Sequence, residues 1–398
     1  MSGGRTTTNA GWADMYIYNA YIKTMSPAGD IPVGYVRTEG GKIVCVRPGE
    51  PPVISPEDID AKGQLLCPGF IDIHTHMGLI GDGLGEEGDD VNEVSDPVMP
   101  HLRAVDGINF RDRCFTEARE AGVTAVITGV GSASPIGGDM AAVKTAGRTL
   151  DEAVIRQVGI KFALGENPKS CYSHRDESPQ TRPATAAIIR EALYKAKRYR
   201  ELCEAAEEVS DLPEYDIKSE ALIPLLEGKI SAHFHCHRAD DIMTALRICD
   251  EFGLSCLLVH CTEGYLIADV LGERKAHAVI GPVIGDRGKP ELSMSSLSNA
   301  ARLAAAGVSV ALCTDHPETP IQYLLTGGAY CVKNGLSKDE ALAAVTSTAA
   351  ALGGIADRVG SIEPGKDADM ILLDGDPFDI FTNVTMTMID GAVCYRRS

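Results

Sequence analysis

Short apolar runs of strand length alternate with amphipathic segments through residues 68–356. The expected strands are residues 70–74, 123–128, 160–164, 230–235, 255–260, 277–280 and 308–314, with a weaker eighth run near residues 140–144. Helical spacing follows most of these runs, for example at residues 240–252 and 297–306, where Gly253 and Gly307 act as helix stops. The alternation predicts an α/β fold of repeated βα units, a (β/α)8 TIM barrel. An open, doubly wound sheet is the alternative.

The two ends of the chain show a different pattern, in which short strands alternate with turns. Residues 14–66 contain strand-like runs at 15–22, 34–37 and 42–46, separated by Gly-Gly and Pro-Pro pairs. Residues 369–395 repeat this pattern around a Gly-Asp-Pro turn at 375–377. We therefore expect residues 1–67 and 357–398 to form one small β-sandwich domain, with the barrel at residues 68–356.

Composition and charge narrow the class of protein. The chain is 44% hydrophobic and 23% charged, which is ordinary globular usage, and its formal net charge of −19 argues against nucleic acid or anionic membranes as partners. Residues 1–18 lack the apolar core of a signal peptide, and no apolar run is long enough to cross a bilayer, so we expect a cytoplasmic protein. The 12 cysteines are scattered through apolar runs without a C-x-x-C pair, which favours reduced, buried thiols.

Potential metal ligands recur at the ends of the expected strands. His74 and His76 are two residues apart in the segment PGFIDIHTHMG (68–78), so both imidazoles should point to the same side of a strand. His235, His260 and Asp315 follow or end three further strands. The carboxyl ends of barrel strands carry the active site, and imidazole and carboxylate groups suit zinc or a similar ion. The sequence thus predicts a catalytic site with a divalent metal.

Three segments carry a resemblance to a known family. The segment at 68–76, the run GVTAV at 122–126 and the tail GSIEPGKDADM at 360–370 resemble the amidohydrolase superfamily, which consists of metal-dependent hydrolases on (β/α)8 barrels. The tail and the split β domain are most similar to the branch that contains imidazolonepropionase and dipeptidase-like hydrolases. The resemblance implies a small-molecule substrate, one or two divalent metals per chain, most simply zinc, and a homo-oligomer.

The resemblance also implies roles for the candidate ligands. His74 and His76 would bind the more buried metal, and His235 and His260 a second one. Asp315 would bind the first metal and the attacking water, take its proton and pass it to the leaving nitrogen, because metal coordination makes hydroxide available near neutral pH.

The strand that ends at His235 requires a choice among histidines on one face. His235 matches the ligand position of the family, whereas His233 lies one layer deeper and is interpreted as a packed core residue. His237 lies beyond the strand and is a candidate for substrate binding.

The segment GIKFALGEN (159–167) offers two candidates for a bridge between two metals, since relatives use a carbamylated lysine or a glutamate on the corresponding strand. Bulky residues alternate with Lys161, so Lys161 should point into the barrel. A buried lysine with a lowered pKa could react with carbon dioxide and bridge as a carbamate. The alternative role for Lys161 is a structural contact with a buried carboxylate. Glu166, at the exit of the strand, is the rival metal ligand.

Residues 167–229 form an unusually long connection, with a polar loop, a charged helix at about 183–208 and an acidic turn. A lid or binding loop is the favoured interpretation, and a solvent-exposed insertion without a role in binding is the alternative. The candidate substrate-binding residues are His237, Tyr172, His174, Arg175, Arg182, Arg238 and Arg287. Arginine suits recognition of a carboxylate, although a surface salt bridge is the more common role of any single arginine.

The leading functional hypothesis is a metal-dependent hydrolase that cleaves a C–N bond of an amide, cyclic amide or dipeptide-like substrate. The alternative is a mononuclear deaminase of a small nitrogen heterocycle, since Glu263 follows His260 by three residues. A third hypothesis is a barrel that kept the fold as a binding protein, which the retained set of ligand-type residues argues against.

Overall fold

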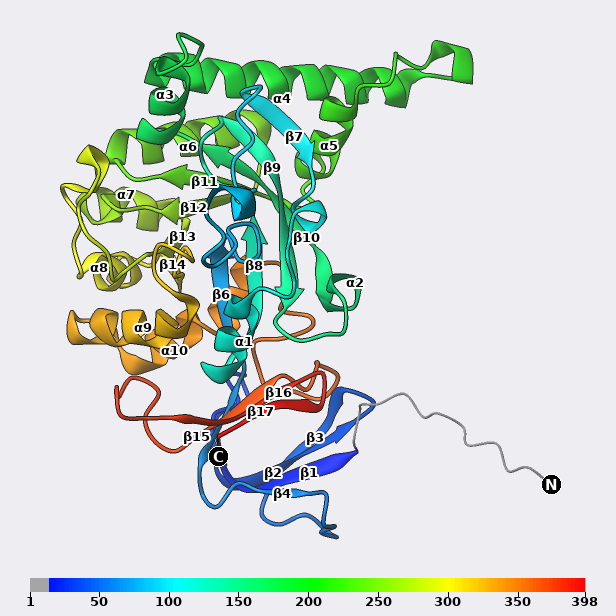
Figure 1. Cartoon of the computed structure of the whole chain (residues 1–398), viewed down its shortest axis with the longest axis vertical. Helices are drawn as coiled ribbons and strands as arrows, with labels where there is room; N and C mark the ends of the chain where they lie inside the picture. Colours follow the sequence, from blue (N-terminus) through cyan, green and yellow to red (C-terminus); the bar gives the residue numbers. More distant parts are fainter. Residues whose placement is uncertain (1–13, 398) are drawn as a thin grey trace.

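The computed structural model of the chain describes residues 14–397, so part of the segment considered above as a signal peptide lies outside the described residues. Two sheets organise the structure: a nine-stranded sheet that forms a nearly closed barrel and an eight-stranded sheet at the ends of the chain. Figure 1 shows the barrel above the smaller sheet, to which both the first and the last described strands belong. A TIM-barrel-like α/β fold is therefore present.

The barrel sheet contains β6 (Phe70–Thr75), β7 (Val98–Leu102), β8 (Val123–Gly129), β9 (Ile136–Lys144), β10 (Val154–Ala163), β11 (Ser231–Cys236), β12 (Cys256–His260), β13 (His277–Ile280) and β14 (Ser309–Leu312). The helices are α1 (Arg113–Glu120), α2 (Leu150–Ala153), α3 (Glu166–Ser173), α4 (Arg182–Ala205), α5 (Ile217–Leu226), α6 (Ala239–Phe252), α7 (Ala268–Glu273), α8 (Asn299–Ala305), α9 (Leu324–Lys333), α10 (Lys338–Ala344) and α11 (Ser347–Leu352). Short 3-10 turns lie at η1 (Gly85–Gly88), η2 (Ala104–Asp106), η3 (Val209–Asp211), η4 (Gly264–Ile267), η5 (Pro290–Leu292) and η6 (Ile321–Tyr323).

The expectation that every barrel strand is parallel is wrong at β9. β6 pairs parallel with β8, and β10 to β14 pair parallel in succession, but β9 is antiparallel to both β8 and β10. The connection between β8 and β9, residues 130–135, is too short for a crossover helix, so these two strands form a hairpin. The weak eighth run is therefore a strand, but it is not part of a βα unit.

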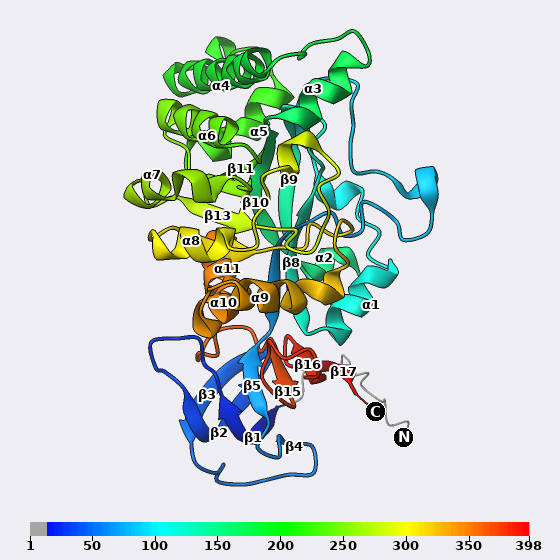
Figure 2. The same cartoon turned by 90° about the vertical axis from the view of Figure 1, so that its left-hand side faces the viewer.

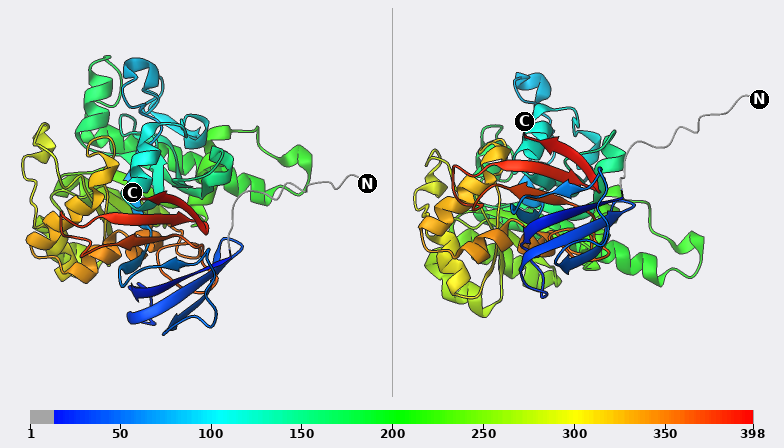
Figure 3. Two further views of the ribbon diagram at one scale, coloured as in Figure 1. Left: turned by 60° about the horizontal axis from the view of Figure 1, so that its bottom comes forward. Right: turned by 90° about the horizontal axis from the view of Figure 1, so that it is seen from below.

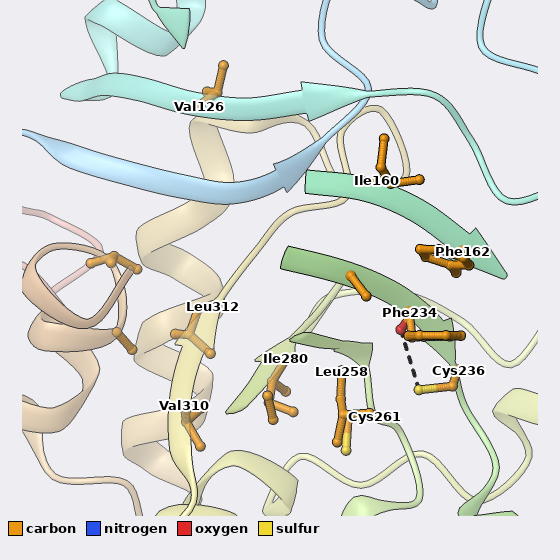
Figure 4. Packing of buried hydrophobic residues seen from close by; sticks show 14 of the residues in the cluster. Val126, Ile160, Phe162, Phe234, Cys236, Leu258, Cys261, Ile280, Val310 and Leu312 are labelled. Atoms are coloured by element: carbon orange, nitrogen blue, oxygen red, sulfur yellow. Dashed lines mark hydrogen bonds between the residues drawn. The ribbon is translucent and has the colours of Figure 1, made fainter. Parts of the chain in front are cut away.

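Side-chain alternation separates the two faces of the barrel strands. On the outer face, Phe162 and Phe234 are completely buried and stack with ring centroids 4.8 Å apart. Figure 4 shows these rings in a row of buried apolar side chains that continues across the neighbouring strands. The bulky residues of β10 thus pack outward against helices, and the residues between them point into the barrel.

The two ends of the chain meet in one hydrogen-bonded sheet. It contains β1 (Met15–Ile22), β2 (Ile31–Glu39), β3 (Lys42–Pro48), β4 (Ile59–Asp60), β5 (Leu65–Pro68), β15 (Met370–Leu373), β16 (Val384–Ile389) and β17 (Ala392–Arg396). β5 joins the ends, because it pairs parallel with β1 and antiparallel with β15. Figure 3, which views this sheet from its own side of the molecule, shows the N-terminal strands in blue next to the C-terminal strands in red. The strands form one continuous sheet with its own apolar core, so a sandwich of two separate sheets is not established.

The long connection after β10 is more helical than expected. The first half of the segment interpreted as a polar loop, residues 170–173, belongs to α3. α4 extends over 24 residues and contacts α6 on the outside of the barrel (Figure 2). α5 packs alongside the second half of this helix, where the Tyr199 hydroxyl donates a hydrogen bond to Glu220. Within residues 14–397, no helix is both long and apolar enough to span a membrane.

Candidate active site and metal centre

The first group of ligand-type side chains lies where the barrel closes between β6 and β14. His74 and His76 come from the end of β6, and the Nε2 atom of each lies 3.4 Å from Oδ1 of Asp315, which follows β14. Two backbone hydrogen bonds align these segments: Asp315 N–H donates to the His74 carbonyl at 3.1 Å, and His76 N–H donates to the His316 carbonyl at 2.8 Å. Closure of the barrel therefore brings together residues that are far apart in the sequence.

Lys161 extends from β10 into the same group. Its Nζ atom lies 3.0 Å from Nε2 of His74, and its side chain is fully buried. Burial disfavours the ammonium form and lowers the pKa of Lys161 to about 8. A substantial fraction of this amine is thus neutral near physiological pH.

The second group contains His235 of β11, His260 of β12 and His237, which directly follows β11. The ring centroids of His235, His237 and His260 lie 4.6 to 4.7 Å apart, and the rings of His237 and His260 are nearly parallel. Nδ1 of His260 donates to the Gly281 carbonyl at 2.7 Å, as Nδ1 of His76 does to the Gly129 carbonyl. A hydrogen bond of this kind fixes the ring and leaves Nε2 free as a ligand.

Burial sets the protonation of the site. It lowers the pKa values of His74, His235 and His237 well below the ordinary value and that of His260 to about 4, so these imidazoles are neutral at pH 7. Burial opposes ionisation of Asp315, but the neighbouring imidazoles hold its pKa well below its usual range. Neutral imidazoles and an ionised carboxylate are the forms that bind a metal.

The donor set fits a divalent first-row cation. Ligand atoms of His74, His260 and Asp315 all lie within 4.8 Å of one another, and so do those of His235, His237 and His260. Oδ1 of Asp315 and Nδ1 of both His74 and His235 are buried without a hydrogen-bond partner, which is costly unless another group satisfies them. Nitrogen and carboxylate ligands with this spacing suit zinc and its neighbours in the first transition row.

A cavity of about 1030 Å³ lies over both groups. Its floor includes His76, His235, His237, His260 and Asp315, whereas His74 and Lys161 are not among its lining residues. Loops after β10 and β13 form much of the rim, which carries Arg287 and Lys289. A substrate in this cavity would therefore meet imidazole and carboxylate groups at its base and two cations at the rim.

The residues predicted to bind substrate have different positions. His237 and Arg287 line the cavity. The others are absent from its lining: Tyr172 is buried and shares a hydrogen bond with Ser134 (2.9 Å), His174 is exposed at the end of α3, Arg175 donates to the Val94 carbonyl, Arg182 pairs with Asp241, and Arg238 pairs with Asp240.

Glu166, the rival metal ligand, is also absent from both ligand groups within the described residues. It is the first residue of α3, and its Oε2 atom accepts a hydrogen bond from the backbone N–H of Glu291 at 3.3 Å. His233 is buried beneath the site, with Nε2 2.9 Å from Oγ of Ser231. A side chain on Gly159 would collide with this ring, because an added Cβ would lie 2.4 Å from Cδ2 of His233.

Sequence reasoning missed two acidic residues next to the site. Asp72 is fully buried and accepts hydrogen bonds from the N–H groups of His74 and Thr314. Glu291 is buried in η5, with Oε1 3.8 Å from Nε2 of His235 and 3.7 Å from Nε2 of His237. Asp72 lies in the quoted histidine segment and could have been noticed there. Glu291 lies on a loop, and no motif or periodicity in the surrounding sequence indicates that it is close to the site.

Comparison with known proteins establishes the family. Residues 225–394 match the amidohydrolase family. The solved structure of an amidohydrolase from Thermotoga maritima MSB8 aligns with a TM-score of 0.92 at 38% identity, covering 96% of this chain and 100% of that one. This chain belongs to the amidohydrolase family.

Two curated relatives refine this assignment. Amidohydrolase tasK of Hapsidospora irregularis is 29% identical over 390 residues, which are 90% of this chain and 39% of tasK, so the chain spans about two fifths of that relative. Imidazolonepropionase of Symbiobacterium thermophilum is 27% identical over 400 residues, 88% of this chain and 85% of the relative. The expected imidazolonepropionase-related branch is thereby confirmed, and with it a hydrolytic enzyme that acts on C–N bonds.

Proposed function

We propose that this amidohydrolase cleaves the C–N bond of an amide, cyclic amide or dipeptide-like molecule, with Asp315 as its catalytic residue. The observation that carries the proposal is the position of the Asp315 carboxylate, at the base of the cavity and 3.4 Å from the imidazoles of both His74 and His76. A carboxylate that touches both a metal site and the substrate space can serve as general base and then general acid.

We assign one ion to His74, His76, Lys161 and Asp315, and a second to His235 and His260. Zinc is the proposed metal for both positions, because imidazole nitrogen and carboxylate oxygen are its usual catalytic ligands. When bound, such a metal lowers the pKa of coordinated water and polarises the carbonyl oxygen of the substrate.

Asp315 moves the proton in this proposal. Its low pKa keeps Oδ1 ionised at neutral pH, so that it can accept a proton from the attacking water. The protonated carboxyl then gives this proton to the leaving nitrogen, which departs as a neutral amine. The N–H of Asp315, bonded to the His74 carbonyl, holds the residue in a left-handed conformation with φ 55°, from which the side chain faces the histidines.

Lys161 is the proposed bridge between the two ions. Its neutral amine can add to the carbon of carbon dioxide and lose a proton, which gives a carbamate with two oxygen ligands. Full burial and the lowered pKa support this reaction, because the charged ammonium form is unfavourable in the barrel interior. Within the described residues, no carboxylate forms an ion pair with Lys161, so the alternative interpretation as a buried salt bridge has less support.

The deaminase alternative has less support from the position of Glu263. Its Oε2 atom accepts a hydrogen bond from Ala239 N–H at 2.9 Å at the start of α6, and the residue does not line the cavity. A carboxylate engaged in this way is not available to a substrate ring without breaking the cap of the helix.

The rim cations suggest an acidic group on the substrate. Arg287 and Lys289 are exposed at the cavity. Among residues 14–397, the Ser295 carbonyl accepts a hydrogen bond from Arg287 and Oδ1 of Asn167 accepts one from Lys289, each at 3.2 Å. Neither cation has a carboxylate partner among the described ion pairs. They therefore could bind a substrate carboxylate at little desolvation cost.

Metal stoichiometry tests the proposal. Elemental analysis of protein purified without chelator should give about two metals per chain in the wild type and fewer in Lys161→Ala, whereas the control Lys289→Ala should keep both. One metal in wild type and Lys161→Ala alike would refute the lysine bridge. The same preparations should then be screened against amides, lactams and dipeptides. Release of ammonia from heterocyclic amines, with no turnover of amides, would instead establish a deaminase.

A further inference from the structure

Glu291 occupies an unusual position behind the second group of histidines. It lies in η5, between β13 and α8, and only 2% of its side chain is exposed. Its Oε2 atom accepts the N–H of Glu166 at 2.9 Å, but its Oε1 atom is buried without any hydrogen-bond partner. An unpaired buried carboxylate oxygen is costly, and its presence requires a compensating group.

The free oxygen faces two imidazoles at distances that no direct hydrogen bond explains. Oε1 lies 3.8 Å from Nε2 of His235 and 3.7 Å from Nε2 of His237, whereas an N–H···O bond measures about 2.7–3.2 Å. Two ligand atoms on one tetrahedral zinc ion, each about 2.0–2.2 Å from the metal, are separated by roughly 3.3–3.5 Å. The observed spacing is within a few tenths of an ångström of that value.

The surrounding chain holds the carboxylate in place. Glu291 and Glu166 exchange reciprocal hydrogen bonds, since each carboxylate accepts the backbone N–H of the other. Gly165 makes room for this arrangement, because an added Cβ would lie 2.7 Å from Oε2 of Glu291, and its φ of +84° suits glycine. The nearby carboxylate of Asp241 is neutralised by Arg182, whereas Glu291 has no such cation within 4 Å among the described ion pairs.

We propose that Glu291 is a metal ligand, which together with His235 and His237 holds the second ion on the side of the cavity away from His74. The proposal rests on the proposed metal-dependent function and changes its ligand set: a carboxylate from the loop after β13 and the histidine beyond β11 join His235 and His260. His237 is then a ligand instead of a substrate contact.

Zinc binding to metal-free protein tests this ligand set without any substrate. The informative variant is Glu291→Gln, which keeps the volume and an oxygen for the Glu166 N–H but removes the charge. Asp241→Asn is the matched control, because it removes a buried carboxylate from the same corner that does not face the histidines. Melting curves of the metal-free proteins establish that each variant folds, and Glu291→Asp, which keeps the carboxylate on a shorter chain, replaces Glu291→Gln if that variant does not.

Competition with a chromophoric chelator gives the affinity for each zinc ion, and the absorption spectrum of bound cobalt reports the ligands. Residues that merely orient a metal ligand change affinity by about 10- to 100-fold. For Glu291→Gln we expect the affinity for the more weakly bound zinc ion to fall more than about 100-fold and the cobalt spectrum to change. We expect the affinity for the more tightly bound ion to stay at its wild-type value, and both affinities to stay unchanged in the Asp241→Asn control.

Three results would overturn the proposal, and they differ in what they mean for the function. A smaller loss with an unchanged cobalt spectrum would make Glu291 a positioning residue for His235. A single ion that His74→Ala abolishes and Glu291→Gln retains would leave the proposed hydrolase intact without this ligand. A wild-type protein that binds no zinc or cobalt would overturn the proposed function and this inference together.

Discussion

Asp72 connects the two strands between which the barrel closes, and its removal is the sharpest test of how the active site is built. Oδ2 accepts hydrogen bonds from Thr314 N–H at 3.0 Å and from its hydroxyl at 2.6 Å, and Oδ1 accepts the N–H of His74 at 3.2 Å. The side chain is fully buried, so water cannot replace these bonds. Thr314 directly precedes Asp315, so a single carboxylate positions residues on both sides of the metal site.

The magnitude follows from the groups left unpaired. Asp72→Ala leaves two buried N–H groups without an acceptor, each at a cost of about 1–3 kcal/mol, so the free energy of unfolding should fall by roughly 2–6 kcal/mol. This is a large part of the roughly 5–15 kcal/mol that ordinarily separates folded from unfolded protein. Asp72→Asn should lose about half as much, because its one amide oxygen can keep both bonds to Thr314 while its NH2 group faces the N–H of His74.

Urea unfolding of the metal-free proteins measures this loss, and zinc titration of the same samples measures the effect on the site. We expect Asp72→Ala to bind zinc more weakly as well, because the segment of Asp315 loses its anchor to β6. An Asp72→Ala variant that is within about 0.5 kcal/mol of wild type and keeps its zinc affinity would refute the reasoning.

Three further predictions use buried residues outside the first ligand group. Burial lowers the pKa of His233 to about 3, so below pH 6.5 the unfolded chain binds more protons than the folded protein, and stability is lost as pH falls from 6.5 toward 3. At pH 5 this loss is about 2 kcal/mol. Urea unfolding in the presence of EDTA should show that acid lowers the unfolding free energy of His233→Asn less than that of the wild type. An equal loss in the two proteins would contradict this prediction. Lys144→Met should cost about 3–5 kcal/mol, because Asp369 would remain buried without its lysine, whereas Asp367, 3.0 Å from Nζ, keeps its ion pairs with Lys42 and Arg358. A fall in unfolding free energy below about 1 kcal/mol would show that Asp369 finds another partner. Phe162→Ala should lower the unfolding free energy by about 3–5 kcal/mol, since the ring of Phe162 is fully buried and stacked. A change near zero in urea unfolding would mean that neighbouring side chains fill the space left by the ring.

Where the sequence-based predictions succeeded, the property was local. Period-two alternation and strand-length apolar runs predicted β6, β8 and β11 to β14 to within two residues, because burial of one face imposes that pattern on each strand by itself. The prediction for β10 found only its second half, since the strand begins at Val154 and not at residue 160. The spacing of His74 and His76 likewise predicted a shared side of one strand. The division into residues 68–356 and the two ends stays a prediction in its boundaries, although β5 and β15 do pair.

Where the sequence-based predictions failed, the property depended on how one element packs against its neighbours. The direction of β9 was decided by a connection too short for a helix. The position of Tyr172 was decided by α3, which forms where a polar loop was expected and turns the tyrosine hydroxyl toward Ser134. Both outcomes follow from how elements pack, which the pattern of either element alone does not contain.

The sequence by itself therefore determined the family, the strands and the identity of most ligand-type side chains, since these are written in local periodicity and short motifs. Only the tertiary structure decided which of them meet. It placed Lys161 3.0 Å from His74, directed the free oxygen of Glu291 toward His235 and His237, and left Arg175 at the surface. The physical reason is that side-chain direction is set within one element, whereas distance between side chains is set by barrel closure and loop packing across the whole chain.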